Sequence, residues 1–290
     1  MHKKQHTLWL LAALAAPLAH FSGSGWLLTV LGALAVLPLA ALPKTWVGMG
    51  KPLALAQILW LGITAGLLVP GSAAYWPSDN DLVVPLTILA LAAVTTETAA
   101  PRVGAVLAFC MALLAVPPAV SGAAKLDADW LRPTVGPLPW ALGLVLLLPN
   151  LPAAGKAGRG RGGICAGVLA ISLAVLVQGT ISAEAAASVP DPFYQTARTL
   201  GHMEPVIAAG VTLGWYTLTV YLLSSARILA KESGIGDVWA GVLVIGTAAA
   251  SVLFRVQLPQ PIPALFGAFF WVLIPFLHKI KNAEKTKKRC

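Results

Sequence analysis

Charged side chains are scarce in this chain. Asp, Glu, Lys and Arg make up only 11% of its 290 residues, whereas hydrophobic residues make up 58%. A soluble core of this size could not bury so much apolar surface. The shortage of charge therefore excludes an ordinary soluble globular protein and indicates an integral membrane protein.

Cysteine and recognisable catalytic motifs are also missing or rare. Cys110 and Cys165 lie inside apolar runs and Cys290 is the last residue, which gives neither a disulfide framework nor metal-ligand spacing. The sequence contains no nucleotide-binding loop, zinc motif, nucleophile elbow or carboxylate dyad. His20 has no spaced partners, which argues against a metal site. We therefore expect no enzyme, metal or cofactor.

The positive charge is placed unevenly along the chain. If the apolar runs are successive spans of alternating direction, only four of the 20 Lys and Arg residues fall on one face, namely Lys125, Arg132, Arg198 and Arg255. The other sixteen fall on the opposite face: Lys3, Lys4, Lys44, Lys51, Arg102, Lys156, Arg159, Arg161, Arg227, Lys231, Lys279, Lys281, Lys285, Lys287, Lys288 and Arg289. This bias favours a cytoplasmic location for both termini, rather than nucleic acid binding. The basic tail could also contact anionic lipid or a partner.

The apolar runs predict about ten helices in one transmembrane domain over residues 1–290, because a bilayer core about 30 Å thick needs roughly 20 apolar residues per span. The predicted segments are 7–21, 25–42, 53–70, 82–96, 103–120, 138–150, 163–182, 203–229, 238–256 and 262–278. Pro192 after Asp191 predicts a short surface helix in the loop before the eighth segment. The first 25 residues also fit a cleaved export signal, but the second segment begins only a few residues later.

The first and sixth segments are too short to span a bilayer as straight helices. Segment 7–21 is about 22 Å long at 1.5 Å per residue and contains Pro17, and segment 138–150 is shorter still. In two inverted halves of five segments, at about 7–120 and 138–278, these two occupy equivalent positions. Interrupted helices at matching positions indicate a transporter binding site, because they expose backbone N–H and C=O groups. The alternative is a plain tight hairpin in "PLAHFSGSGW".

A ligand site between the first, third, sixth and eighth segments follows from this arrangement. Its candidate residues are Pro17, His20, Ser22, Gly23, Ser24, Gln57, Gly136, Trp140, Tyr216 and Thr217. Arg198 and Glu204 are candidate charges at the outer mouth of the eighth segment. For the polar residues within spans, the alternative role is a hydrogen bond to a neighbouring helix. For Glu204, it is an exposed interfacial charge.

Several stretches resemble the B-subunit permeases of spore germination receptors, which belong to the amino acid, polyamine and organocation transporter superfamily. The matching stretches are "LDADWLRPTVG", "LLLPNL", a basic loop "KAGRGRGG", "SGSGWLLTVLGALAVLPLAAL" with its leading Trp26, and the Lys-rich tail. The strongest element is the run Pro192, Phe193, Tyr194, Arg198 and Glu204 that leads into the eighth segment. The chain is shorter than that family usually is, and the missing length falls in the first and sixth segments.

This resemblance implies an all-α, five-plus-five inverted-repeat fold with discontinuous first and sixth helices. It also implies a subunit in the inner membrane of a cell or spore that senses a small, amino-acid-like nutrient. Its expected partners are membrane lipid, a larger A subunit and a lipoprotein C subunit. Two alternatives remain, a secondary amino acid transporter and a structural membrane subunit without a ligand site.

Overall fold

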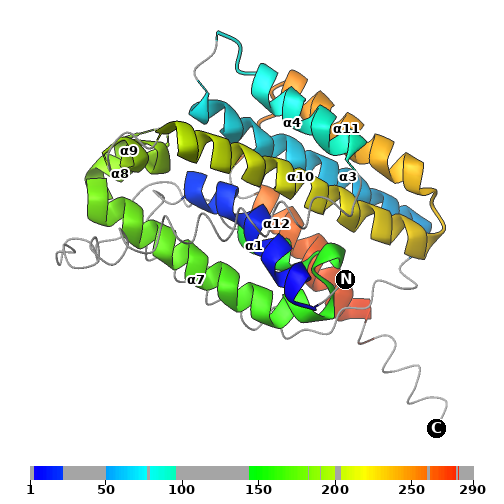
Figure 1. Cartoon of the computed structure of the whole chain (residues 1–290). Coiled ribbons are helices and arrows are strands. Elements are labelled where there is room, and N and C mark those ends of the chain that lie inside the picture. Colours follow the sequence, from blue (N-terminus) through cyan, green and yellow to red (C-terminus); the bar gives the residue numbers. More distant parts are fainter. Residues whose placement is uncertain are drawn as a thin grey trace.

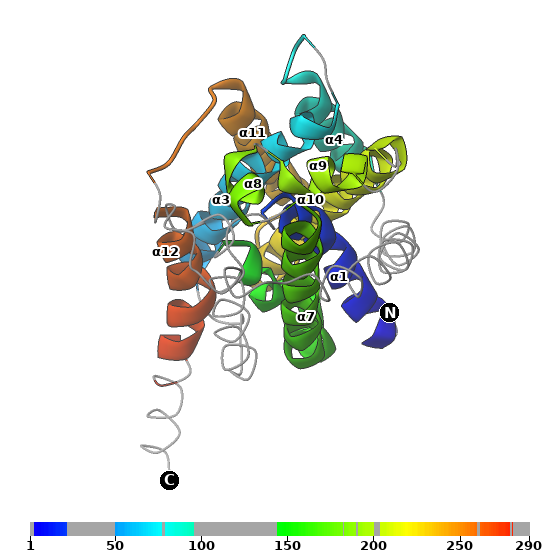
Figure 2. The same cartoon turned by 90° about the vertical axis from the view of Figure 1, so that its left-hand side faces the viewer.

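The computed structural model describes residues 3–21, 50–76, 79–95, 144–181, 183–189, 191–199, 204–259, 262–278 and 280. These residues form a bundle of helices, and none of them belongs to a β-strand (Figures 1 and 2). The all-α fold class is therefore confirmed over this part of the chain.

In the first half of the chain, α1 covers Lys3–His20 and α3 covers Lys51–Leu68. A 3₁₀ helix, η1, continues α3 without a break over Val69–Tyr75. The next helix, α4, covers Val83–Val94. The expected loop after the third segment therefore starts later than predicted, because "VPGSAAY" extends the helix.

In the second half, two 3₁₀ turns, η3 (Leu148–Asn150) and η4 (Pro152–Ala154), lead into α7 (Gly155–Ile181). Two short helices follow, α8 (Ala183–Ser188) and α9 (Pro192–Thr199). The long helix α10 covers Glu204–Ser233 and α11 covers Asp237–Leu253. The last helix, α12, covers Ile262–Ala268 and continues as a π-helix, η5, over Phe269–Leu273.

Most predicted segments that can be compared match a helix closely. The third, fourth, eighth, ninth and tenth are α3, α4, α10, α11 and α12. The predicted basic loop "KAGRGRGG" is wrong, because these residues are the first turns of α7. The predicted helix after Asp191 is confirmed as α9. Segments 25–42 and 103–120, and residues 138–143 of the sixth, lie outside the described residues.

Two of the described helices are long and apolar enough to cross a membrane. They are the continuous helix Lys51–Tyr75, of 25 residues, and Glu204–Ser233, of 30 residues. Shorter apolar helices include Trp9–His20, Val83–Val94, Gly167–Ile181, Asp237–Leu253 and Ile262–His278. The length and composition of the two long helices are compatible with association with a membrane.

Helix α10 is the centre of the bundle (Figure 1). It contacts α1 on one side and α3, α4 and α11 on the other, and α7 packs on α1. Lys51, at the start of α3, lies beside Gly234, just after the end of α10. The opposite end of the bundle holds His20, η1 and α9, and we refer to it as the His20 end. The long helices therefore run antiparallel between two chemically different ends.

The closest packing in the bundle joins α3 to α11. Gly62 and Gly66 are four residues apart on one face of α3, which is the small-xxx-small spacing that lets two helix backbones approach. A Cβ atom on Gly62 would lie 2.8 Å from the Thr247 Cβ and from the Val244 carbonyl oxygen. On Gly66, a Cβ would collide with the Ser251 Cβ. The two parallel helices therefore depend on these glycines.

We expect Gly66→Val to lower the free energy of unfolding by about 1–3 kcal/mol, because the new side chain must push α11 away. Gly246→Val is the matched control, since a Cβ at Gly246, on α11, meets nothing within 4 Å. Thermal unfolding of both variants in the same detergent measures the difference. Equal stability of the two variants would contradict the close α3–α11 contact.

Candidate functional site

Pro17 lies in the last turn of α1 and does not interrupt the helix. The helix continues to His20, and the Phe21 N–H donates to the Pro17 carbonyl oxygen at 3.0 Å. His20 is thus the final residue of α1. The break predicted in "PLAHFSGSGW" falls at or after this residue. Its remaining members, Ser22, Gly23 and Ser24, lie outside the described residues.

Asp191 starts α9 as its N-cap. Its Oδ1 atom accepts the backbone N–H of Tyr194 at 2.9 Å, and its backbone carbonyl accepts the N–H of Gln195 at 3.2 Å. Pro192 occupies the first helical position, where its missing N–H is not needed. The sequence "DPFY" therefore folds locally into a capped helix, which fixes the direction of the Asp191 carboxylate.

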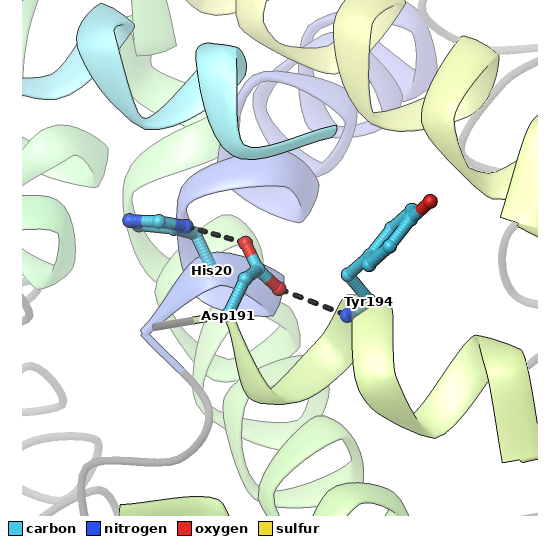
Figure 3. Close-up of polar contacts among 3 residues, drawn as sticks. All are labelled: His20, Asp191 and Tyr194. Carbon is cyan, nitrogen blue, oxygen red and sulfur yellow. Dashed lines mark hydrogen bonds and ion pairs between the residues drawn. The ribbon is translucent and has the colours of Figure 1, made fainter. Parts of the chain in front are cut away.

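The second oxygen of that carboxylate contacts α1. The Nδ1 atom of His20 lies 2.7 Å from Oδ2 of Asp191, although the two residues are 171 positions apart (Figure 3). The exposed fraction of the Asp191 side chain is 5%, and that of His20 is 17%. Because a carboxylate only accepts, Nδ1 carries the proton in this pair. The Nε2 atom of His20 makes no hydrogen bond within the described residues.

Aromatic rings surround the His20–Asp191 pair. The His20 ring centroid lies 4.9 Å from that of Phe21, 6.0 Å from that of Trp215 in α10, and 6.5 Å from that of Tyr75. The Tyr75 ring in turn meets the Tyr194 ring edge-on, with 5.8 Å between the two ring centroids. These rings exclude water from one side of the pair and bring together residues from α1, η1, α9 and α10.

The backbone of η1 also approaches the imidazole closely. A Cβ atom on Gly71 would lie 3.1 Å from the Nε2 atom of His20 and 3.0 Å from Cζ2 of Trp215. Only glycine fits this position without displacing one of the two rings. The free nitrogen of His20 therefore faces η1.

Three buried polar atoms in residues around this pair have no hydrogen-bond partner within the described part of the chain. They are the Ser72 Oγ, the Tyr75 hydroxyl and the Trp215 Nε1, all in fully buried side chains. The Tyr75 hydroxyl lies close to the Asp191 carboxylate, but without hydrogen-bond geometry. A buried polar group without a partner costs about 1–3 kcal/mol. Tyr75 and Trp215 are in ring contact with His20, and Ser72 follows Gly71, so these groups make the His20 end a candidate binding site for a polar molecule.

The groups gathered here are suited to binding a polar ligand. The free groups are two hydroxyls, one indole N–H and the lone pairs left on Asp191 and on the His20 Nε2. This set offers donors to a ligand carboxylate and acceptors to a ligand ammonium.

The other predicted site residues within the bundle make contacts of their own. The Nε2 atom of Gln57 donates to the Phe270 carbonyl at 3.1 Å, which ties α3 to the π-helix η5. The Tyr216 hydroxyl lies 2.7 Å from the Thr95 Oγ1, and the Thr217 Oγ1 donates to the Leu213 carbonyl of its own helix. These three side chains connect helices or bond within one.

The remaining candidates are at the surface or outside the described residues. Arg198 is exposed on α9, and Glu204 is partly exposed at the start of α10. Gly136 and Trp140 lie outside the part of the chain that the structure describes. Five of the ten predicted ligand-site residues are described by the structure, and of these only His20 belongs to the cluster, with Pro17 one turn before it in α1.

Four residues of this cluster are not predicted as site residues from the sequence: Ser72, Tyr75, Asp191 and Trp215. Asp191 was recognised only as the residue before a helix-starting proline. Its signal was available, because a carboxylate in "SVPDPFY" lies between apolar residues and is expected to need a partner. Ser72, Tyr75 and Trp215 give no signal of their own, since nothing in the sequence distinguishes them from packing residues.

Comparison of the sequence with protein-family models finds no match, and comparison with curated proteins finds none either. The function is therefore inferred from the geometry of the cluster at the His20 end.

A double-mutant cycle on His20 and Asp191 tests whether they interact as the geometry indicates. With His20→Ala, Asp191→Ala and the double variant, we expect a coupling energy of about 1.5–3 kcal/mol, typical of a hydrogen bond to a charged group. The loss of the α9 cap is present in both arms of the cycle and cancels. Gln195→Ala, at an exposed position on α9, is the control, with a change below about 0.5 kcal/mol. Additive effects of the two changes would exclude the pair.

Proposed function

We propose that this protein is the nutrient-sensing membrane subunit of a spore germination receptor, with an amino acid permease-like fold of about ten spans in two inverted halves. In this proposal it lies in the inner membrane of the cell or spore, with both termini cytoplasmic. The two apolar helices Lys51–Tyr75 and Glu204–Ser233 and the uneven distribution of Lys and Arg support the membrane placement.

The observation that best supports nutrient sensing is the buried polar cluster at the His20 end. Its members come from the first and eighth segments, from η1, which continues the third segment, and from α9. Transporter folds hold small ligands between helices, with few polar groups in an otherwise apolar site. The unpartnered Ser72, Tyr75 and Trp215 atoms are such groups.

The free groups of this cluster match the two charged groups of a small amino acid. Its carboxylate would accept from Ser72, Tyr75 and Trp215, and its ammonium would donate to the free lone pairs of Asp191. Both charges of the zwitterion would then be paired inside the protein, which removes most of the cost of burying them. The ligand would replace the close contact between η1 and His20, because Gly71 leaves no space there.

Sensing requires that this binding favours one of two arrangements of the bundle. Separation of η1 from α1 is the change that a ligand at His20 would cause. A larger A subunit and a lipoprotein C subunit would read the new arrangement, as the resemblance to the germination receptors implies. A secondary amino acid transporter would use the same site but move the ligand across the membrane. A structural subunit would bind no ligand at all.

Ligand binding distinguishes these functions. We expect the purified protein in lipid nanodiscs to bind at least one compound from a panel of labelled amino acids. The test is made with the protein alone and with the protein in complex with the partner subunits, and binding in either preparation supports the proposal. Ser72→Ala should weaken binding roughly ten-fold, equivalent to about 1.4 kcal/mol for one lost hydrogen bond. Thr217→Val is the control, since the Thr217 hydroxyl already bonds within its own helix.

Two results would redirect the proposal. Concentrative uptake of the bound compound into vesicles, driven by an ion gradient, would favour the transporter. Absence of binding, both alone and with the partner subunits, would leave the structural subunit.

The orientation in the membrane is tested by cysteine labelling. In a variant that lacks the native cysteines, Gln195→Cys places a thiol on an exposed position at the His20 end, and Lys231→Cys places one near the opposite end. An impermeant thiol reagent applied to intact cells should label the first position and spare the second. The reverse pattern would invert the topology, and labelling of both would mean that these positions do not lie on opposite sides of a membrane.

A further inference from the structure

A hydrophobic groove opens beside α3. It lies between α3, α11, α12 and the segment that joins the last two, and its volume is about 390 Å³. Hydrophobic side chains form most of its wall, among them Trp60, Ile63, Ala250, Phe254, Leu258 and Phe266. Of its two hydroxyl-bearing residues, Ser251 donates its hydroxyl hydrogen bond to the Thr247 carbonyl within α11. The groove is therefore suited to a hydrocarbon chain rather than a polar ligand.

A residue next to the lining of the groove in the sequence has an unusual backbone. Arg255 lies between the lining residues Phe254 and Val256, and its φ angle is +47°. It is the C′ residue of a Schellman motif, because its N–H donates to the Val252 carbonyl and the Val256 N–H donates to the Ser251 carbonyl. Glycine is the usual residue at this position, since a side chain is disfavoured in the left-handed conformation.

Arg255 is the only non-glycine residue with a positive φ among those that the structure describes. Its side chain is exposed, and no hydrogen bond or ion pair to it occurs within the described part of the chain. An arginine at a position that favours glycine indicates that its side chain has a role. A guanidinium beside a hydrophobic groove matches the two parts of an anionic phospholipid, a phosphate group and an acyl chain.

We propose that this groove binds one anionic phospholipid, with an acyl chain between α3 and α12 and the headgroup phosphate on Arg255. The exposed side chains around the groove support a lipid as the occupant. Phe254 is 81% exposed, Leu253 53% and Phe266 48%, so the surroundings of the groove are themselves hydrophobic. The site rests on the proposed membrane location, but not on nutrient sensing.

The experiment compares thermal unfolding of the full-length protein in neutral detergent after addition of phosphatidylglycerol or phosphatidylcholine. We expect phosphatidylglycerol to raise the unfolding midpoint more than phosphatidylcholine does. Arg255→Gly should raise the midpoint in detergent alone by about 2–4 °C, because it relieves the left-handed backbone, yet abolish the difference between the two lipids. Arg255→Gln, which keeps the backbone conformation, should also abolish that difference. Lys231→Gln, a matched exposed cation at the other end of the bundle, should preserve it.

The groove itself is tested by filling it. Ala250→Phe should reduce the stabilisation by both lipids, whereas Gly246→Phe, one turn away and with open space around it, should not. Equal shifts with both lipids in the unchanged protein would overturn recognition of the headgroup. A full response of Ala250→Phe, or an equal response to glycerol phosphate without acyl chains, would overturn the lipid site. Extraction of the protein from cells without detergent would instead refute the membrane location.

Discussion

The approach of α1 to α10 is the contact on which the candidate site depends. A Cβ atom on Gly214 would lie 2.6 Å from the Ala16 Cβ, so glycine is required where the two helices meet. His20 follows Ala16 by one helical turn, and Trp215 follows Gly214 directly. The same contact therefore brings the imidazole and the indole within 6.0 Å of each other. Close backbone packing therefore brings buried polar groups of the site together, among them the Trp215 Nε1, which has no hydrogen-bond partner within the described residues.

The positions of the helices could be predicted from the sequence because they depend on local patterns. Runs of apolar residues between charged or Pro-rich breaks located α3, α4, α10, α11 and α12, and Asp191–Pro192 located the start of α9. Where the pattern was ambiguous, the prediction failed. Glycine and arginine in "KAGRGRGG" are typical of a loop, yet the segment is helical and continuous with the rest of α7. Local propensity there is weaker than the preference of the helix to continue.

The candidate site could be predicted only in part, because its contacts are not local. His20 stood out as a polar residue at the end of an apolar run, but its partner is 171 residues away in the chain. Nothing in the sequence specifies that α9 folds back against the end of α1. Gln57, Tyr216 and Thr217 were polar residues within apolar segments in the same way as His20. Their hydrogen bonds to Phe270, Thr95 and Leu213 became visible only with the structure.

Helix α3 connects the proposed nutrient site at the His20 end with the proposed lipid groove. The face of α3 that contains Gly62 and Gly66 packs closely against α11. Its continuation, η1, brings Gly71 against His20 without an intervening loop. Since packed helices move as units rather than deform, a ligand that separates η1 from His20 must also displace α3, and α11 with it. The proposed lipid groove lies between these two helices and α12, so a displacement of α3 and α11 relative to α12 would change its shape. In the proposed mechanism, the lipid and the nutrient are therefore coupled through the position of α3.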